Sequence, residues 1–177
     1  QLKQVGEQQG TNKGGVFEDK KDGSHSYVKF QDANHSLNEW IAATLYKWFD
    51  VPLPNTTLVT EKGITKGVAS DWVYGSKPIS PAEFNKLDDA TRQAFIKHFL
   101  IDAYLGNWDV VGNGPNWNMM MLPNGEVMRL DPGGALLFRA QGAEKGEAFG
   151  AAIKELQTMQ DAGKNPTAAE VFKNISI

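Results

Sequence analysis

The sequence of 177 residues contains no cysteine. That absence excludes a disulfide framework, a zinc or iron–sulfur site with cysteine ligands, and catalysis by a thiol. The chain also has no long apolar run and begins with predominantly polar residues, so neither a membrane-spanning helix nor a secretory leader is expected. These features favour a cytoplasmic protein. Because the sequence starts at Gln1 and not at Met, we expect processing or a fragment, such as part of a larger phage or toxin protein delivered into a host.

A strong charge bias is missing as well. Eighteen Lys and Arg residues face 21 Asp and Glu residues, which gives a net charge of -3, and no long run of either sign occurs. General electrostatic binding to nucleic acid or to an anionic membrane is therefore not expected. A chain of this length with 41% hydrophobic residues can bury one sizeable core but hardly two. We expect one domain, or two small lobes that share a cleft.

The first thirty residues predict three strands. LKQVG, VFED and SYVKF have strand composition, and Asp22-Gly23 is a turn signal between the last two. The loop before VFED contains Gly10, Gly14 and Gly15, which would allow backbone amides to approach an anion such as a phosphate closely. An ordinary flexible hairpin loop is the alternative, because isolated glycine patterns are weak signals.

Lys29 and Glu39 are the first charged residues with a possible chemical role. Lys29 lies between Val28 and Phe30, so strand alternation directs it to the opposite face, either into solvent or onto the floor of a cleft. A helix is predicted over about Leu37–Phe49, and Ser36 and Glu39 fit a capping box at its start. Glu39 either serves as that capping carboxylate or pairs with Lys29, and the sequence alone does not choose between them.

The next segments complete the predicted fold. TTLVT and GVASDWV are expected strands joined at Lys62-Gly63, so that residues 1–74 form a mostly antiparallel sheet with one helix. Further on, helices are expected after Ser80-Pro81, from Asp88 to about Gly106, over about Ala148–Gln160, and after a capping box formed by Thr167 and Glu170.

Between these helices, three oxygen-bearing side chains flank a predicted hairpin. NMMML and EVMRL read as short strands around the turn Pro123-Asn124-Gly125. Asp109 precedes this hairpin, Asn118 begins its first strand and Asp131 leaves its second. Oxygen ligands that converge from strand ends suit Mg²⁺ that keeps waters and takes further ligands from a nucleotide. Turn formation explains Asp109 and Asp131 singly, but it does not explain their arrival as a set.

Glycine loop, strand lysine, helix glutamate, connector, helix, Asp, Asn, hairpin and Asp-x-Gly follow one another in the order found in protein kinases. The chain resembles a very small member of the protein-kinase-like superfamily, near the atypical branch of HipA-type and phosphatidylinositol-kinase-like proteins. Five strings also resemble a bacterial and phage group of such domains: GTNKGGVFED, YVKF, NEWIAATLY, GNWDVVG and RLDPGGALLFRAQG. The resemblance implies an α+β, two-lobed fold with an N-lobe at 1–76 and a C-lobe at 77–177.

The resemblance also implies a role for each candidate residue. Gly10, Gly14 and Gly15 would form the phosphate loop, Lys29 would bind the α- and β-phosphates, and Glu39 would be its ion-pair partner. The hinge that offers backbone groups to adenine would be Asp71, Trp72 and Val73. Asp109 would orient the acceptor hydroxyl, and Asn118 and Asp131 would hold the metal. Arg139 would steady a phosphate or the segment after Asp131, although a surface position explains it equally well.

Several motifs depart from the family pattern. Asn107-Trp108-Asp109 replaces His-Arg-Asp, Asp131-Pro132-Gly133 replaces Asp-Phe-Gly, and Asn116 is a possible substitute for Asn118. The resemblance implies an ATP- and Mg-dependent enzyme that transfers the γ-phosphate to a hydroxyl acceptor, on a protein or on another molecule. The alternatives are a nucleotide-binding pseudokinase and an interaction module that uses the five tryptophans. The acceptor and the oligomeric state stay open.

Overall fold

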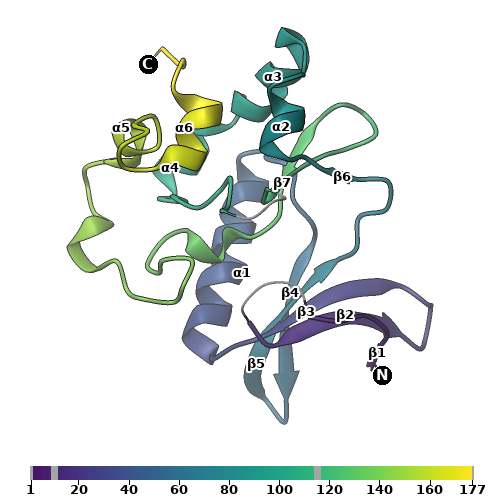
Figure 1. Ribbon diagram of the computed structural model, residues 1–177. Coiled ribbons are helices and arrows are strands. Elements are labelled where there is room, and N and C mark those ends of the chain that lie inside the picture. Colours follow the sequence, from purple (N-terminus) through teal and green to yellow (C-terminus); the bar gives the residue numbers. More distant parts are fainter. Residues whose placement is uncertain (1, 9–11, 114–116, 177) are drawn as a thin grey trace.

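The computed structural model describes residues 2–8, 12–113 and 117–176. Its first half is built on an antiparallel sheet of five strands in the order β1-β2-β3-β5-β4 (Figure 1). The strands are β1 (Leu2–Gln4), β2 (Gly14–Asp19), β3 (His25–Phe30), β4 (Thr56–Glu61) and β5 (Ile64–Asp71). The helix α1 (Ala33–Trp48) contacts β4 and β5 on one side and the second half of the chain on the other. The predicted α+β class is confirmed.

The centre of this sheet is β3, the strand that carries Lys29. Lys29 pairs with Gly14 of β2 on one side and with Val68 of β5 on the other. A Cβ atom at Gly14 would lie 2.1 Å from the carbonyl oxygen of Val28, so a side chain cannot be accommodated there. Glycine at this position therefore allows β2 and β3 to approach, and the tight pairing fixes the strand from which the Lys29 side chain projects.

The predicted start of the first helix is wrong by four residues. α1 begins at Ala33, and the carboxylate of Asp32 accepts hydrogen bonds from the backbone N–H groups of Asn34 and His35. Asp32 already satisfies the N–H groups that a cap must satisfy, so no second cap is needed one turn later. Ser36 lies inside the helix, where its hydroxyl donates to the carbonyl oxygen of Asp32 at 2.7 Å. Glu39 is consequently free of a capping role.

The face that α1 buries contains few large apolar side chains. The buried face consists of small and polar side chains: Ser36, Asn38, Glu39, Ala42, Ala43 and Tyr46. Trp40 and Trp48 are exposed, at 38% and 75% respectively. Small residues allow α1 to pack closely against the rest of the chain, and this close packing positions Glu39 inside the protein.

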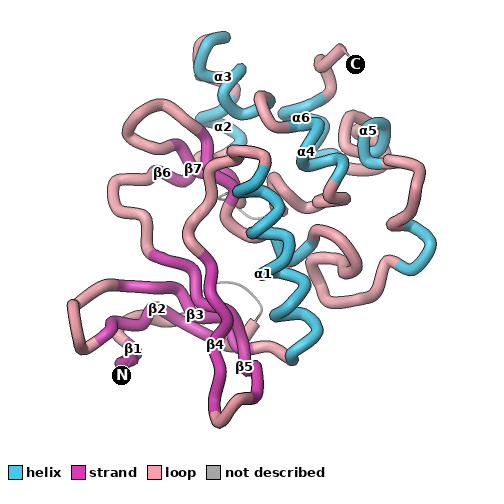
Figure 2. Tube along the Cα trace, turned by 180° about the vertical axis from the view of Figure 1, so that it is seen from behind, coloured by secondary structure: helices cyan, strands magenta, loops and turns pink. Residues whose placement is uncertain are grey.

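The second half combines a small sheet with short helices (Figure 2). The sheet has the order β6-β7-β8, with β6 (Lys77–Pro78), β7 (Met119–Met121) and β8 (Val127–Arg129), and it contains the predicted hairpin. The helices are α2 (Pro81–Phe84), α3 (Asp89–Ile96), α4 (Phe99–Tyr104), α5 (Glu155–Thr158) and α6 (Pro166–Phe172), with 3-10 turns η1 (Pro132–Gly134) and η2 (Gly146–Ala148). Among the described helices, none has the length and apolar character needed to cross a membrane.

Some helix boundaries were predicted and others were not. The predicted helix starts after Ser80 and at Asp88 are confirmed, the first with a capping box of Ser80 and Glu83 and the second with Asp88 as the cap. The expected long helix after Asp88 is divided into α3 and α4 around Lys97 and His98. The expected helix over 148–160 is reduced to the four residues of α5, and α6 is capped by Asn165 and not by Thr167.

Two apolar clusters form the core, and one of them joins the two halves. The larger one packs the helices of the second half around Phe95, Phe99, Trp117 and Phe172. The smaller one joins α1 to the second half and consists of Ala42, Tyr46, Val51, Leu105 and Ala135. Figures 1 and 2 both show α1 between the five-stranded sheet and the short helices. α1 is thus the element through which the two halves are placed relative to each other.

Candidate functional site

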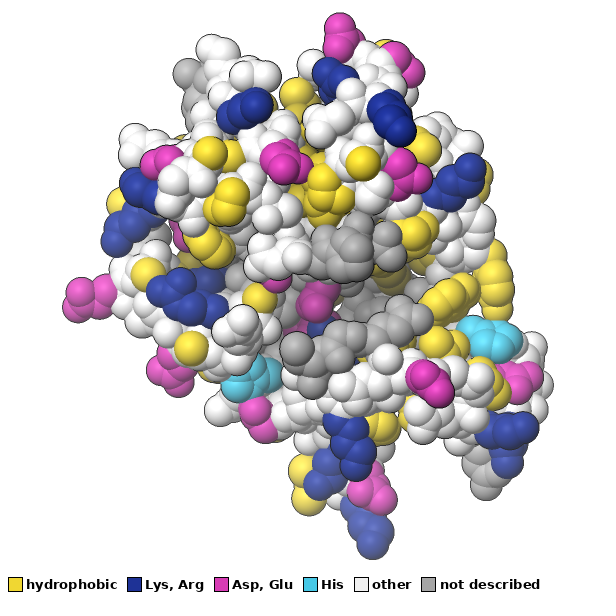
Figure 3. Space-filling model, in the orientation of Figure 1, with side chains coloured by type: hydrophobic (Ala, Val, Ile, Leu, Met, Phe, Trp, Pro, Cys, Tyr) yellow, Lys and Arg dark blue, Asp and Glu magenta, His cyan; other side chains and the backbone are white. Residues whose placement is uncertain are grey.

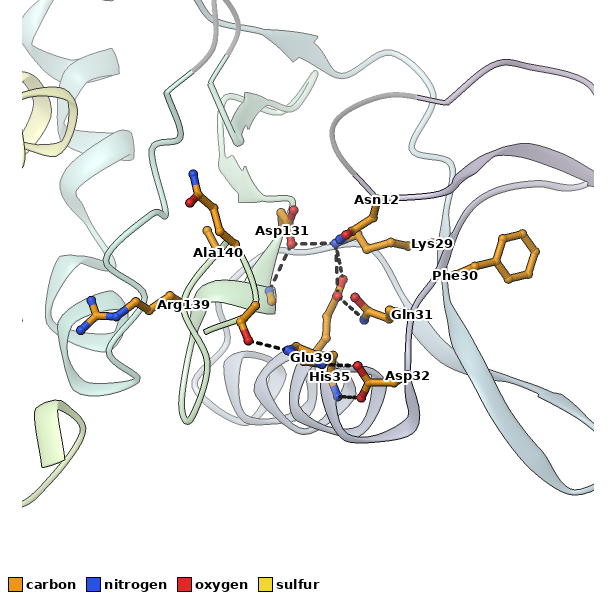
Figure 4. Close-up of a pocket in the computed structure, with 13 residues that line it drawn as sticks. Asn12, Lys29, Phe30, Gln31, Asp32, His35, Glu39, Asp131, Arg139 and Ala140 are labelled. Carbon is orange, nitrogen blue, oxygen red and sulfur yellow. Dashed lines mark hydrogen bonds and ion pairs between the residues drawn. The ribbon is translucent and has the colours of Figure 1, made fainter. Parts of the chain in front are cut away.

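Three charged side chains from distant parts of the chain meet beside α1 (Figure 4). The ammonium nitrogen of Lys29 lies 3.0 and 3.2 Å from the two carboxylate oxygens of Glu39. It also donates to Oδ1 of Asp131 at 2.9 Å, across 102 positions of the sequence. The Lys29 and Glu39 side chains are 12% and 3% exposed, whereas Asp131 is 45% exposed. The structure therefore pairs Glu39 with Lys29 and adds a more open second carboxylate.

Gln31 belongs to the same cluster, and the sequence analysis missed it. Its side-chain amide donates to Oε2 of Glu39 at 2.9 Å. It lies two positions after Lys29, and residues two apart along an extended segment face the same side, so strand alternation was the signal that could have found it. Gln31 and Lys29 together hold the Glu39 carboxylate in one orientation.

The charges of this cluster shift one another's protonation. Burial disfavours the charged form of Lys29, but Asp131 and Glu39 overcome this and raise the pKa of its ammonium above the ordinary value. Enclosure acts to raise the pKa of Asp131, and the neighbouring ammonium of Lys29 outweighs it and lowers the pKa. Burial raises the pKa of Glu39, which Lys29 offsets in part. Lys29 therefore stays protonated at neutral pH.

Asp131 is presented by a tight turn that α1 supports. Oδ1 of Asp131 accepts a hydrogen bond from the backbone N–H of Gly133 at 3.1 Å, which caps η1. The side-chain amide of Asn38, next to Glu39 in α1, donates to the carbonyl of Ala135 at 2.9 Å, and its oxygen accepts from the N–H of Leu137 at 3.1 Å. The helix that carries Glu39 thus also holds the loop that carries Asp131.

Asp109 lies in a loop after α4, and its electrostatics are unusual. Burial, together with the negative charge of Asp131, raises the pKa of Asp109 to about 6. The side-chain amide of Asn113 donates to Oδ1 of Asp109 at 3.4 Å, and that of Asn118 donates to the Asp109 backbone carbonyl at 3.2 Å. The structure therefore brings Asp109, Asn118 and Asp131 into one region, as the hairpin predicted. Asn116 lies outside the described residues.

The oxygen donors fit a hard cation such as Mg²⁺. Asp131 and Asp109 are two carboxylates whose charges act on each other, and a cation between them would relieve that repulsion. Asp131 also keeps Oδ2 without a hydrogen bond to any residue that the structure describes. No group of three or more His, Cys, Asp or Glu side chains with metal-binding geometry occurs among the described residues. The protein supplies few ligands, which is the situation in which Mg²⁺ retains waters and binds substrate phosphates.

Two cavities meet at Lys29, Glu39 and Asp131. One, of about 260 Å³, has a mainly apolar lining that includes Val68, Met120, Met128 and Leu130, and all three predicted hinge residues, Asp71, Trp72 and Val73, line it. The other, of about 530 Å³, is lined by polar side chains such as Asn12, Gln31 and His35. Figure 3 shows charged side chains on the floor of a hollow near the centre of the molecule. An apolar cavity that joins a polar one at a lysine suits a ligand with a flat base and charged phosphates.

The backbone N–H groups of the three predicted hinge residues differ in whether they already form hydrogen bonds. The N–H of Asp71 donates to the carbonyl of Asn55, and that of Trp72 donates to the carbonyl of His25, each at 2.9 Å. Both groups are therefore already used. The N–H of Val73 forms no hydrogen bond with any residue that the structure describes. Of these three backbone N–H groups, that of Val73 is therefore the one without a partner among the described residues.

The glycines are only partly placed. Gly14 and Gly15 lie inside β2, where their lack of a side chain is explained by the close approach of neighbouring strands. Gly10 lies outside the described residues. Arg139 is exposed, and its guanidinium points away from Lys29 (Figure 4). In this view Arg139 does not contact the charged cluster of Lys29, Glu39 and Asp131.

A buried ionic network lies next to the site, and the sequence analysis also missed it. Arg129 donates to both carboxylate oxygens of Asp102, at 2.6 and 3.3 Å, and the two side chains are 1% and 0% exposed. The Tyr46 hydroxyl of α1 donates to Asp102 at 2.9 Å and accepts from the side-chain amide of Asn107 at 3.0 Å. The network thus links α1 to the loop that carries Asp109. The signal in the sequence that could have found this network was an arginine in the otherwise apolar strand β8, whose residues are VMR.

Comparison with known proteins bears on the fold. No family model matches the chain, and none of the curated proteins does. Among solved structures, the chain is similar to a Helicobacter pylori protein described as the proinflammatory kinase CtkA, with a TM-score of 0.56 and 15% sequence identity. The chain has a kinase-like fold. The match covers 89% of this chain and 66% of CtkA, so the chain spans just under two-thirds of the length of that neighbour. At this identity the likeness concerns the fold alone.

Proposed function

We propose that the protein is an ATP- and Mg²⁺-dependent phosphotransferase, with residues 1–76 and 77–177 acting as its two lobes. The observation that carries the proposal is the meeting of Lys29 with Glu39 and Asp131 between an apolar and a polar cavity. Positioning and electrostatic stabilisation are the main tasks in phosphoryl transfer, and these residues are suited to both. The kinase-like fold and the description of its neighbour as a kinase agree with this function.

The proposed roles follow from the contacts. Lys29 binds the phosphates, and Glu39, itself held by Gln31, fixes the direction of the ammonium. Asp131 and Asn118 would hold Mg²⁺, which supplies positive charge to the phosphates when it is bound. Lys29 and Asp131 contact each other directly, and phosphates and Mg²⁺ are proposed to replace part of this contact when nucleotide binds.

Asp109 is proposed to accept the proton of the acceptor hydroxyl. Its pKa of about 6 leaves it mostly ionised at neutral pH while it remains more basic than an ordinary aspartate. The acceptor is proposed to be a hydroxyl group on a protein. The proposal also includes a relation to HipA-type and phosphatidylinositol-kinase-like proteins, which the motif strings around Lys29 and Asp131 support.

The first experiment is thermal unfolding with and without Mg²⁺-ATP. A ligand at about 100 times its Kd stabilises a folded protein by about 2.7 kcal/mol, which for a chain of this size raises Tm by about 5–10 °C. We expect this shift in the wild type and in Asp89→Ala, whose side chain is 98% exposed, and we expect its loss in Asp131→Ala. An absence of any shift in the wild type at millimolar Mg²⁺-ATP would refute the nucleotide site. Nucleotide binding without any phosphotransfer would contradict the enzymatic function and favour the alternative of a pseudokinase.

A further inference from the structure

Lys145 is a buried lysine whose contacts the proposed function does not use. It lies just before η2 and is 7% exposed. Its ammonium donates to the carbonyl oxygen of Gly106 at 2.6 Å and to that of Gly134 at 2.7 Å. These two carbonyls belong to segments that are 39 and 11 positions away in the sequence. One side chain therefore connects two separate loops.

The environment of this ammonium is poor in compensating charge. Within the described residues, Lys145 forms no ion pair, and the ring of Phe149 lies 5.6 Å from its nitrogen. Burial lowers the pKa of Lys145 to about 8, Glu155 acts in the opposite direction, and Arg139 acts with burial. Burying an ammonium without a carboxylate partner is unfavourable. If this side chain only filled space in the interior, an apolar residue would give a more stable protein.

Both loops held by Lys145 carry carboxylates of the site. Gly106 lies three residues before Asp109, and Gly134 lies three residues after Asp131. Gly106 has a φ of +65°, and a Cβ atom there would lie 3.0 Å from the Phe149 ring and 3.4 Å from the Lys145 nitrogen. The loop is therefore shaped to receive the ammonium. Besides this contact, a backbone hydrogen bond of 2.7 Å from Leu136 to Leu105 joins the same two segments.

We propose that Lys145 is a positioning residue that clamps the loop of Asp109 to the loop of Asp131 and thereby sets the separation of the two carboxylates. It touches neither carboxylate and acts only through the carbonyls of Gly106 and Gly134. This inference rests on the proposed function for its catalytic meaning. The clamp itself can be tested without nucleotide or turnover.

The test compares Lys145→Met with Lys154→Met, in which an exposed lysine is replaced, by amide hydrogen exchange. The free energy of a hydrogen bond from a charged group corresponds to a change of about 10- to 100-fold in the equilibrium constant for local opening. In Lys145→Met we expect exchange to accelerate by about this factor at the N–H groups of Asn107 and Leu136, one in each clamped segment. Exchange at Val28, in the centre of the large sheet, should stay unchanged. Lys154→Met should alter none of them.

Two results would overturn the clamp. Unchanged exchange at Asn107 and Leu136 in a folded Lys145→Met variant shows that the contact positions nothing. Equal acceleration at these amides and at Val28 shows that Lys145 contributes only to general stability. If Lys145→Met does not fold, Lys145→Gln gives the same test, because its shorter side chain cannot reach both carbonyls.

A binding measurement then separates the clamp from the proposed function. Adenosine needs only the apolar cavity, whereas Mg²⁺-ATP also needs the carboxylates. In Lys145→Met we expect the Kd for Mg²⁺-ATP to rise about tenfold or more, with the Kd for adenosine unchanged. Equal weakening of both ligands contradicts positioning. A wild type that binds neither ligand refutes the proposed function, and the exchange experiment still decides the clamp.

Discussion

Replacing Asp109 by asparagine should stabilise the protein at neutral pH, although it removes the proposed catalytic carboxylate. The pKa of Asp109 is raised to about 6 from an ordinary value of 3.8, chiefly by burial and then by Asp131. Folding therefore favours the protonated, neutral form of this side chain. Its contribution to stability is complete below about pH 4 and is lost as the pH rises through about 6. Asparagine is neutral at every pH and avoids this loss.

The magnitude follows from the size of the shift. One pKa unit corresponds to about 1.36 kcal/mol, so the full shift amounts to about 3 kcal/mol. Because Asp109 is partly exposed, solvent screening reduces this, and we expect Asp109→Asn to gain about 1–3 kcal/mol at pH 8. At pH 4 the gain should be a small fraction of that value. The gain should level off above about pH 7.

Urea unfolding followed by circular dichroism at pH 4 and pH 8 measures this difference. Asp89→Asn is the matched control because its carboxylate is 98% exposed, and it should change stability by less than about 0.5 kcal/mol at both pH values. If Asp109→Asn is no more stable than the wild type at pH 8, or if its gain is the same at both pH values, the electrostatic argument for this site is wrong. The experiment requires no substrate.

Three further predictions concern the site and its support. The kcat/KM for phosphotransfer, which reports the free enzyme, should rise with pH through about 6 as Asp109 loses its proton, and Asp109→Asn should abolish transfer but keep the Tm shift with Mg²⁺-ATP. Arg129→Met leaves Asp102 buried without its partner and should cost about 3–5 kcal/mol in chemical denaturation, whereas Lys164→Met, from an exposed pair 3.8 Å apart, should cost less than about 1 kcal/mol. Gly14→Ala places a Cβ atom 2.1 Å from a backbone oxygen of β3 and should cost more than about 1–3 kcal/mol in the same assay.

Each of these predictions has a clear contrary result. A kcat/KM for phosphotransfer that is flat between pH 5 and 8 would contradict the proposed role of Asp109 in proton transfer. Equal costs for Arg129→Met and Lys164→Met would mean that burial does not determine the value of the ion pair. Gly63 has a φ of +78° and open space around it, so Gly63→Ala tests backbone strain without a clash. A cost for Gly14→Ala no larger than that for Gly63→Ala would contradict the packing argument.

The sequence predicted the positions of those candidate residues that carry a local signal. Strand alternation separated Lys29 from its apolar neighbours, and the turn signals around the hairpin placed Asp109 and Asp131 near each other. Glu39 had two possible roles, and only the structure decides between them. The deciding factor lies outside Glu39 itself, because Asp32 caps the helix and leaves the Glu39 carboxylate to Lys29.

Long-range contacts had no comparable signal. Lys145 lies in an irregular segment, where no periodicity defines a buried face, and its partners are backbone carbonyls that any residue provides. The predicted helix over 148–160 failed for a related reason. A short helix needs a face to bury, and Ala152 and Ile153 are exposed, so most of that segment has no packing to stabilise it.

The charge balance of the site gives a reason for the proposed dependence on Mg²⁺. Glu39, Asp109 and Asp131 are three carboxylates in one region, and Lys29 is the ammonium that contacts two of them. Its effect on the remaining carboxylate, Asp109, is too weak to prevent the rise in the pKa of that group. Metal-free ATP would add further negative charge to this excess, whereas a divalent cation offsets it. The negative charge of Asp131, which adds to burial in raising the pKa of Asp109, is therefore also a reason to propose that nucleotide binding requires Mg²⁺.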